Sequence, residues 1–216
     1  FLSSFQIAIQ MGAVLAVVFL YGKSLVLNPR ILRRIVAAFI PTALIGLAFY
    51  AFIKKILISN EMVVAWSLLG GGIILIAFEL WYKEQEVFSD DVGLLSYKQA
   101  VLIGLFQSLA MIPGVSRAAA TIIGGLSLGL KRKTIVEFSF LLSIPTMAAA
   151  TGLDLIKTGA SFSGAQIGLL AAGFLAAFCV ALASIKFLLY FIKNHNFIVF
   201  GVYRIVIAVL FLMLYR

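Results

Sequence analysis

The sequence predicts an all-α, polytopic membrane protein with about six transmembrane helices and one re-entrant helical hairpin. The chain of 216 residues is 63% hydrophobic and 12% charged, which is about half the charged fraction of an ordinary soluble domain. Its mean hydropathy is +1.16. Backbone groups in lipid have no water to bond, so the apolar segments are expected to be helices. We therefore interpret residues 1–216 as a single integral membrane domain.

Six apolar stretches are long enough, or nearly long enough, to cross a bilayer, which takes about 20 helical residues. The first is short, and we expect its beginning to be missing, because the chain starts at Phe1 without an initiator Met. The fifth is long enough to tilt. The stretches are residues 5–21, 35–52, 63–82, 135–156, 166–192 and 197–215.

The stretch 99–130 differs from these six because the helix-breaking pair Pro113-Gly114 divides it. It forms either one broken span or a re-entrant hairpin that returns to its own side of the membrane. Basic loops stay in the cytoplasm, and this rule decides between the two. If the basic residues of 23–34 are cytoplasmic, a hairpin keeps the basic cluster 131–133 inside, whereas a full crossing places it outside. The hairpin is therefore favoured.

A weak internal repeat supports this organisation, because residues 5–11 resemble residues 138–144 and two more spans follow each. We interpret residues 1–96 as a first repeat, truncated at its N-terminus, and residues 97–216 as a second repeat that contains the hairpin 99–130. Three spans per repeat would leave the two repeats inverted in the membrane, with broken helices meeting near the midplane. This symmetry predicts another hairpin before Phe1.

The hairpin carries the features of an anion site. Arg117 is the only charged residue of the stretch 99–130, and an intramembrane arginine costs roughly 2.5–3.5 kcal/mol on insertion scales, so a function is expected. A helix beginning near Ser116 would direct free N–H groups and its positive dipole end towards Gly114. Ser116 and Thr121 add hydroxyl donors, and the Arg117 fork suits phosphate oxygens. The sequence therefore predicts a phosphate or pyrophosphate site.

The alternative is an ordinary kink in which Arg117 snorkels or pairs with a carboxylate. The candidate partners are Glu79, Glu137 and Asp154. Glu79 is otherwise expected to be an interfacial carboxylate next to aromatic residues. His195 is expected to be a solvated loop histidine.

Two further features lie inside apolar stretches. Arg204 lies within the last one, where we expect it to snorkel or to pair with a carboxylate, with a substrate contact as the alternative. The run 70–72 consists of three glycines, and we interpret it as a site of close helix packing.

The motif residues resemble those of the undecaprenyl-pyrophosphate phosphatases of the bacitracin-resistance type. Residues 107–110 (Gln-Ser-Leu-Ala), residues 113–117 (Pro-Gly-Val-Ser-Arg) and Thr121 match that family's signature P-G-x-S-R-S-x-x-T and the residues before it. Residues 97–100 and 137–142 fit as well, and the resemblance covers the whole chain.

The resemblance implies removal of one phosphate from a C55 isoprenoid diphosphate, which recycles the lipid carrier of peptidoglycan synthesis. It implies a bacterial cytoplasmic membrane, with the active site facing the periplasm or the cell exterior. Carried over by position, Arg117, Ser116 and Thr121 would be catalytic, and Gly114, Val115 and Gln107 would bind substrate. Ser116 would be either a phosphate donor or the nucleophile.

This chain departs from the family pattern in two ways. Ala118 replaces the second serine of the signature, and the glutamate-rich stretch and the P-V-S-S-T-G-H run of the family are absent. The resemblance implies a divalent cation, Mg or Ca, with ligands in that missing segment, and we identify no metal ligands in this chain. We therefore expect this chain by itself to hold half an active site and to be inactive.

Two other functions can be compared with the phosphatase by the sequence features that each requires. A transporter or flippase for an anionic polyprenyl phosphate lipid would use the same inverted repeats and helix-terminus site. A type 2 phosphatidic acid phosphatase would need a histidine shortly after Arg117, and residues 118–124 contain none.

The net charge of +9 reflects cytoplasmic loops, so no nucleic acid partner is expected. The expected partners are the bilayer and the polyprenyl diphosphate lipid; the oligomeric state stays open, a homodimer included.

Overall fold

The computed structural model describes residues 2–52, 60–83, 92–158 and 164–215. All regular secondary structure in these ranges is helical. The α-helices are α1 (Leu2–Leu27), α2 (Pro29–Ala48), α3 (Tyr50–Phe52), α4 (Glu61–Trp81), α5 (Tyr97–Ser108), α6 (Arg117–Ser127), α7 (Arg132–Thr158), α8 (Gly164–Phe191) and α9 (Ile198–Leu214), with short 3₁₀ turns η2 (Val92–Leu94) and η3 (Leu109–Met111).

The predicted fold class is confirmed, because each of the six apolar stretches corresponds to a helix. Helices α1, α2, α4, α7 and α8 contain segments long and apolar enough to cross a membrane, and α9 is a shorter apolar helix of 17 residues. The short α5 and α6 replace the seventh apolar stretch. The molecule is thus an all-α, multi-pass membrane protein.

Local capping signals determine where several helices begin. The Asn28 side chain accepts a hydrogen bond from the Arg30 N–H at 3.1 Å, and Pro29 occupies the first helical position of α2, where proline is favoured. The helix therefore begins before the apolar stretch 35–52, because the cap and the proline precede the apolar residues. Ser96 and Gln99 form a capping box at the start of α5, which satisfies two free N–H groups at once.

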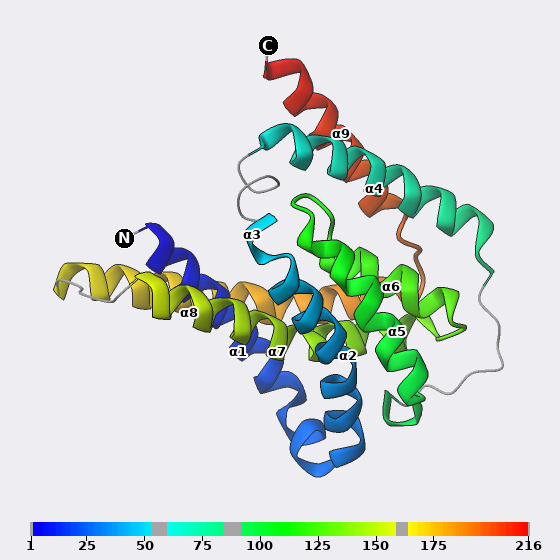
Figure 1. Ribbon diagram of the computed structural model, residues 1–216, viewed down its shortest axis with the longest axis horizontal. Helices are drawn as coiled ribbons and strands as arrows, with labels where there is room; N and C mark the ends of the chain where they lie inside the picture. The colour runs from blue at the N-terminus through cyan, green and yellow to red at the C-terminus, as the bar shows by residue number, and fades with distance from the viewer. Residues whose placement is uncertain (1, 53–59, 84–91, 159–163, 216) are drawn as a thin grey trace.

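The helices pack in layers around the hairpin. Helices α4 and α9 lie side by side, and α1 packs along both α8 and α7 (Figure 1). Between these groups lie α5 and α6: α5 packs on α2, and α6 contacts both α4 and α7. A Cβ added at Gly72 would lie 2.8 Å from the Gly201 carbonyl oxygen, so α4 and α9 cross closely at these two glycines. Close packing was the interpretation of the run 70–72, and it is confirmed at Gly72.

The hairpin prediction is confirmed, because the two ends of the hairpin lie together. The Gln99 side chain at the start of α5 donates a hydrogen bond to the Leu128 carbonyl at the end of α6, at 3.3 Å. Arg34 on α2 donates to the Leu95 carbonyl just before α5. The chain therefore enters and leaves the bundle at the same end.

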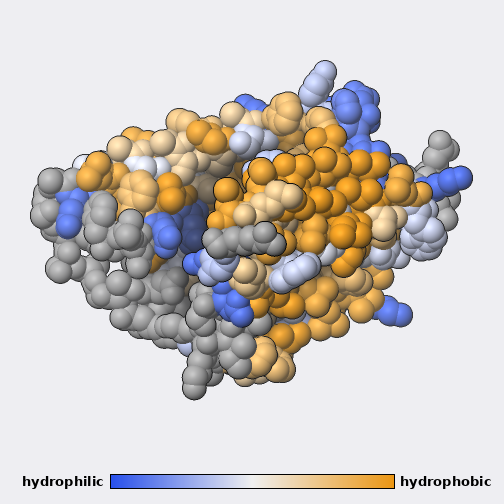
Figure 2. All heavy atoms as spheres, turned by 90° about the horizontal axis from the view of Figure 1, so that it is seen from above, coloured by the Kyte–Doolittle hydropathy of each residue, from blue (hydrophilic) through white to orange (hydrophobic). Residues whose placement is uncertain are grey.

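The outer surface is suited to lipid. In Figure 2 hydrophobic side chains cover the right-hand part of the face, and hydrophilic ones lie at its upper and right margins and around a hollow left of the centre. Large apolar side chains such as Trp66, Leu80 and Leu214 are 60%, 74% and 83% exposed. Exposed apolar area of this extent marks a membrane-facing surface rather than a water-facing one.

Two sequence predictions are not tested by the structure. The side chain of Asp154 lies outside the described residues, so its pairing with Arg117 is not assessed. The division into repeats 1–96 and 97–216 stays a prediction.

Candidate functional site: the turn and helix terminus of the hairpin

A tight turn separates the two helices of the hairpin. The Val115 N–H donates to the Ile112 carbonyl at 3.0 Å, across Pro113 and Gly114. Gly114 has φ +89°, a region that side chains other than glycine rarely adopt. Proline followed by a residue with positive φ is the pattern of a type II turn. A Cβ at Gly114 would also lie 2.5 Å from the Val64 carbonyl oxygen of α4, so this position requires glycine for two reasons.

Ser116 begins the second helix of the hairpin, as the sequence predicts. Its side chain accepts a hydrogen bond from the Ala119 N–H at 3.2 Å, which makes it the N-cap of α6. The Ala120 N–H bonds to the Ser116 carbonyl at 2.9 Å, the first helical hydrogen bond. The N–H groups of Arg117 and Ala118 precede that bond and have no intrahelical acceptor. The terminus therefore offers backbone donors and a positive dipole end to an anion.

Arg117 points away from its helix into the bundle. Its Nη1 atom donates to the Thr146 hydroxyl of α7 at 3.2 Å. In the described part of the chain it pairs with no carboxylate; Glu79 instead pairs with Arg132 at 2.5 Å. The pairing of Arg117 with Glu79 is therefore excluded. Among the described residues, the side-chain partner of this half-buried guanidinium is a neutral hydroxyl, which leaves its charge available for an anion.

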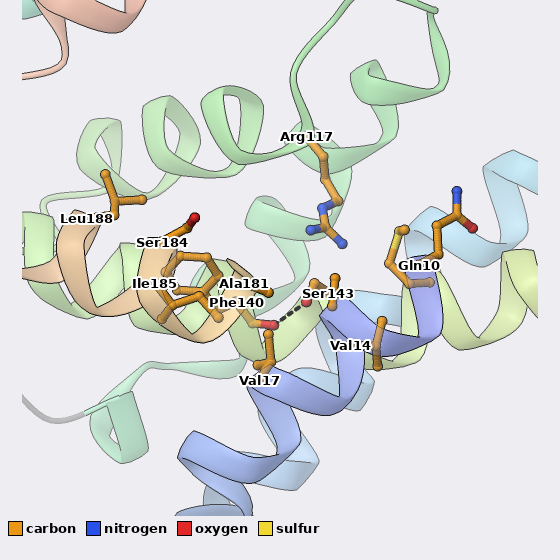
Figure 3. A pocket seen from close by; sticks show the side chains of 12 residues that line it. Gln10, Val14, Val17, Arg117, Phe140, Ser143, Ala181, Ser184, Ile185 and Leu188 are labelled. Atoms are coloured by element: carbon orange, nitrogen blue, oxygen red, sulfur yellow. Dashed lines mark hydrogen bonds between the residues drawn. The ribbon is translucent and has the colours of Figure 1, made fainter. Parts of the chain in front are cut away.

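The guanidinium of Arg117 lines a cavity of about 260 Å³ between α1, α6, α7 and α8. Figure 3 shows the Arg117 side chain extending into it, with Ser143 below and Gln10 on the neighbouring α1. The polar side chains of this wall are Gln10, Arg117, Ser143 and Ser184, and the remaining wall is apolar. A cavity with one cation, neutral donors and apolar walls is suited to a phosphate group carried on an apolar molecule.

A second cavity, of about 270 Å³, lies on the other side of the α6 terminus. Its polar residues are Ser116, Tyr203 and Arg204, and aromatic residues at the start of α9 supply much of its wall. Leu188 of α8 lines both cavities. The N-terminus of α6 thus lies between two cavities, each containing one arginine.

Two of the six predicted site residues face other helices. The Thr121 side chain is fully buried, 2.7 Å from Ser139 Oγ on α7 and 3.0 Å from the Arg117 and Ala118 carbonyl oxygens. Its hydroxyl therefore joins α6 to α7. Gln107 is 2% exposed and donates to the Thr42 hydroxyl of α2 at 3.1 Å. This contact fastens α5 to α2, and the substrate contact predicted for Gln107 stays a prediction.

Gly114 and Val115 form the turn itself. They line neither cavity, and the Gly114 carbonyl oxygen is bonded to Arg204. Their position is next to the candidate anion site, where they determine the direction of the chain into α6. Of the predicted set, Arg117 lines the first cavity and Ser116 lines the second, on either side of the α6 terminus.

The other charged candidates also have defined surroundings. Arg204 was expected to snorkel or to pair with a carboxylate; instead it is buried and donates to two backbone carbonyls. Glu79 is 7% exposed and ion-paired with Arg132, and its position at the membrane interface stays a prediction. His195 is exposed and stacks on Phe191 with ring centroids 4.3 Å apart, as expected for a loop histidine.

The residues that the structure describes do not fit a divalent cation. They contain no group of three or more histidine, cysteine, aspartate or glutamate side chains that could hold a metal. The cavity walls carry no carboxylate or imidazole among the described residues. The neutral oxygens of Ser143, Ser184 and Gln10 are weak ligands for Mg²⁺ or Ca²⁺ compared with carboxylates.

Sequence reasoning missed Thr146, Ser143, Gln10 and Ser184. Each is a polar residue within an apolar helix, a weak signal that many packed membrane helices share. Thr146 follows Pro145, which lies inside α7. This proline within an apolar helix was the stronger local signal of a special position.

The fold and the site together define a class: a multi-pass membrane protein with a candidate anion site at the broken tip of a helical hairpin. The family model for the bacitracin resistance protein BacA matches residues 1–210. This chain belongs to the BacA family.

Curated relatives agree with this assignment. The chain is 50% identical over 211 residues to an undecaprenyl-diphosphatase of Aquifex aeolicus, covering 98% of this chain and 82% of the relative. It is 46% identical over 212 residues to one of Sulfurihydrogenibium sp., with 98% and 83% covered. An undecaprenyl-diphosphatase of Campylobacter jejuni is 45% identical over 216 residues, with 100% and 80% covered.

Proposed function

We propose that this chain is an undecaprenyl-diphosphatase, which hydrolyses a C55 isoprenoid diphosphate to the monophosphate and inorganic phosphate. The observation that carries the proposal is Arg117, which reaches a cavity of the membrane bundle with a hydroxyl, not a carboxylate, as its bonded side-chain partner. Family membership and the printed names of the relatives support the same activity.

The proposed reaction is an attack of water on the terminal phosphorus. The bond between that phosphorus and the bridging oxygen breaks, the lipid monophosphate leaves, and the proton of the water passes to solvent or phosphate. Charge develops on the phosphoryl oxygens during this transfer, and its stabilisation is the main task of the protein. Arg117 and the first N–H groups of α6 are the donors that we assign to these oxygens.

Ser116 is assigned as a donor to phosphate. Its oxygen already accepts the capping hydrogen bond from the Ala119 N–H, while its hydroxyl proton remains available. A nucleophilic serine needs an adjacent base, and the described cavity residues supply no carboxylate or imidazole. The divalent cation implied by the resemblance stays a prediction, and no step proposed here depends on it.

We place the protein in the bacterial cytoplasmic membrane, with the site open to the cell exterior. A lipid substrate suits this arrangement, because an isoprenoid chain can remain among apolar helix faces while its diphosphate reaches Arg117. Recycling of the lipid carrier for cell-wall synthesis is the proposed role, and the link to bacitracin resistance follows from the family. A homodimer stays a prediction.

The test is release of inorganic phosphate from undecaprenyl diphosphate by the protein purified in detergent. It compares the 216-residue chain with a form extended at its N-terminus, each as wild type and as Arg117→Ala. We expect release by the longer wild-type form, with loss of activity in Arg117→Ala and an unchanged elution profile. Substrate binding without release by either form would instead favour a transporter or flippase of the anionic lipid.

A further inference from the structure

Arg204 is a second buried arginine that the proposed chemistry does not use. It lies in the middle of α9 and is 8% exposed. A buried charge in a membrane helix is costly unless it is bonded. In the described part of the chain no carboxylate pairs with it, and its bonded partners are backbone carbonyls.

These two carbonyls belong to different parts of the fold. Nη2 of Arg204 donates to the Gly114 oxygen in the hairpin turn at 2.9 Å and to the Ser67 oxygen of α4 at 3.2 Å. Nη2 carries two hydrogens, so it can make both bonds at once. One side chain thus joins α9, α4 and the turn that precedes Ser116.

The bond to Gly114 holds one peptide group from both sides. The Gly114 oxygen accepts from Arg204, and the N–H of the same peptide group, on Val115, donates to the Ile112 carbonyl. Rotation of this peptide group would break both bonds. Ser116 and Arg117 follow directly, so the orientation of this group determines where the α6 terminus points.

Gly71 makes room for this arrangement. A Cβ added there would overlap with Nη2 of Arg204 and lie 3.2 Å from its Cζ atom. The adjacent Gly70 differs, because a Cβ at that position meets no described atom within 4 Å. Gly71 therefore leaves room for the Arg204 guanidinium, whereas a side chain at Gly70 would not contact it.

We propose that Arg204 is a positioning residue for the phosphatase site: it holds the Gly114–Val115 peptide so that Ser116 and Arg117 face the diphosphate. The inference rests on the proposed function. Arg204 acts through the turn rather than on the substrate, so its loss lowers kcat more than it raises KM. A misplacement of catalytic groups by about 1 Å costs about 100-fold in rate.

The experiment measures kcat and KM for phosphate release in detergent, per folded molecule, in four single variants of the active form of the protein. Arg204→Met removes the donors and Gly71→Ala displaces them. Arg204→Lys keeps a shorter cation, and Gly70→Ala is the matched control. We expect kcat to fall about 10- to 100-fold in Arg204→Met and Gly71→Ala. Arg204→Lys is expected to be intermediate and Gly70→Ala to match wild type.

The double variant Gly71→Ala/Arg204→Met distinguishes a shared cause from two separate ones. If both changes act through the same contact, the double variant is no slower than Arg204→Met alone. Multiplied losses would overturn the inference, as would wild-type kcat in Arg204→Met. A raised KM at unchanged kcat would also overturn it, because that result makes Arg204 a substrate ligand. If the wild type releases no phosphate, the proposed function fails instead.

Discussion

Arg117 Nη1 and Thr146 Oγ1 lie 3.2 Å apart and join the start of α6 to the middle of α7. The Thr146 hydroxyl donates in turn to the Leu142 carbonyl at 2.7 Å. Thr146 is thus an acceptor whose own proton is already committed to the helix. It holds the guanidinium in place without neutralising it, as a site for an incoming anion requires.

Thr146→Val tests this relationship. The substitution keeps the shape of the side chain and removes the acceptor, so Arg117 loses its fixed position but keeps its charge. One such hydrogen bond contributes about 0.5–1.5 kcal/mol, so we expect kcat/KM to fall about 2- to 12-fold. Thr146→Ser keeps the hydroxyl and is expected to stay near wild type. A loss in Thr146→Ser together with wild-type turnover in Thr146→Val would show that the methyl group matters instead.

Ser116→Ala separates a phosphate donor from a nucleophile. Loss of the N-cap costs about 1 kcal/mol of stability, and loss of one donor to developing charge costs about 100- to 1000-fold in kcat. We expect such partial loss, with residual turnover measurable by phosphate release. Ser116→Thr keeps both the cap and the hydroxyl and is the control. Complete inactivity of a folded Ser116→Ala protein would instead support the nucleophile.

Thr121→Val tests the catalytic role that the family signature implies. The Thr121 hydroxyl contacts Ser139 and the α6 backbone, so its removal is expected to weaken the α6–α7 contact by about 1–3 kcal/mol, because Ser139 loses a buried partner. We expect a lower thermal midpoint and a loss of kcat far smaller than in Arg117→Ala. A Thr121→Val protein with wild-type stability and no turnover would show instead that Thr121 is a catalytic residue.

The buried ion pair of Glu79 and Arg132 is expected to matter for stability and not for turnover. Arg132 begins α7, whereas the Arg117 cavity is lined by α7 from Phe140 onwards. Removing one member of a buried pair costs about 3–5 kcal/mol, because the other charge loses its ion-pair partner.

Thermal unfolding in detergent measures this effect. Glu79→Leu is expected to lower the midpoint strongly, and adding Arg132→Met is expected to recover part of the loss. Phosphate release per folded molecule should stay near wild type in both proteins. A double variant less stable than Glu79→Leu would show that Arg132 contributes mainly through its cation–π contacts with Tyr82 and Phe197.

The sequence by itself determined the membrane class, the helices and the hairpin, because these depend on local properties. Apolar length predicts a membrane helix, Pro113-Gly114 predicts the break, and the basic cluster 131–133 predicts the side to which the hairpin returns. Ser116 as a cap and Arg117 as the exceptional charge were found for the same reason. Each is recognisable from its immediate neighbours in the chain.

Only the tertiary structure decided what the polar side chains contact. Thr121 and Gln107 carry suitable groups for a phosphate, but helix packing directs them to Ser139 and Thr42. Arg204 is 90 residues away from Gly114 along the chain, yet the α4–α9 crossing brings its guanidinium to the turn. Side-chain direction depends on which helices pack together and at what angle, and no local pattern in a single sequence specifies that geometry.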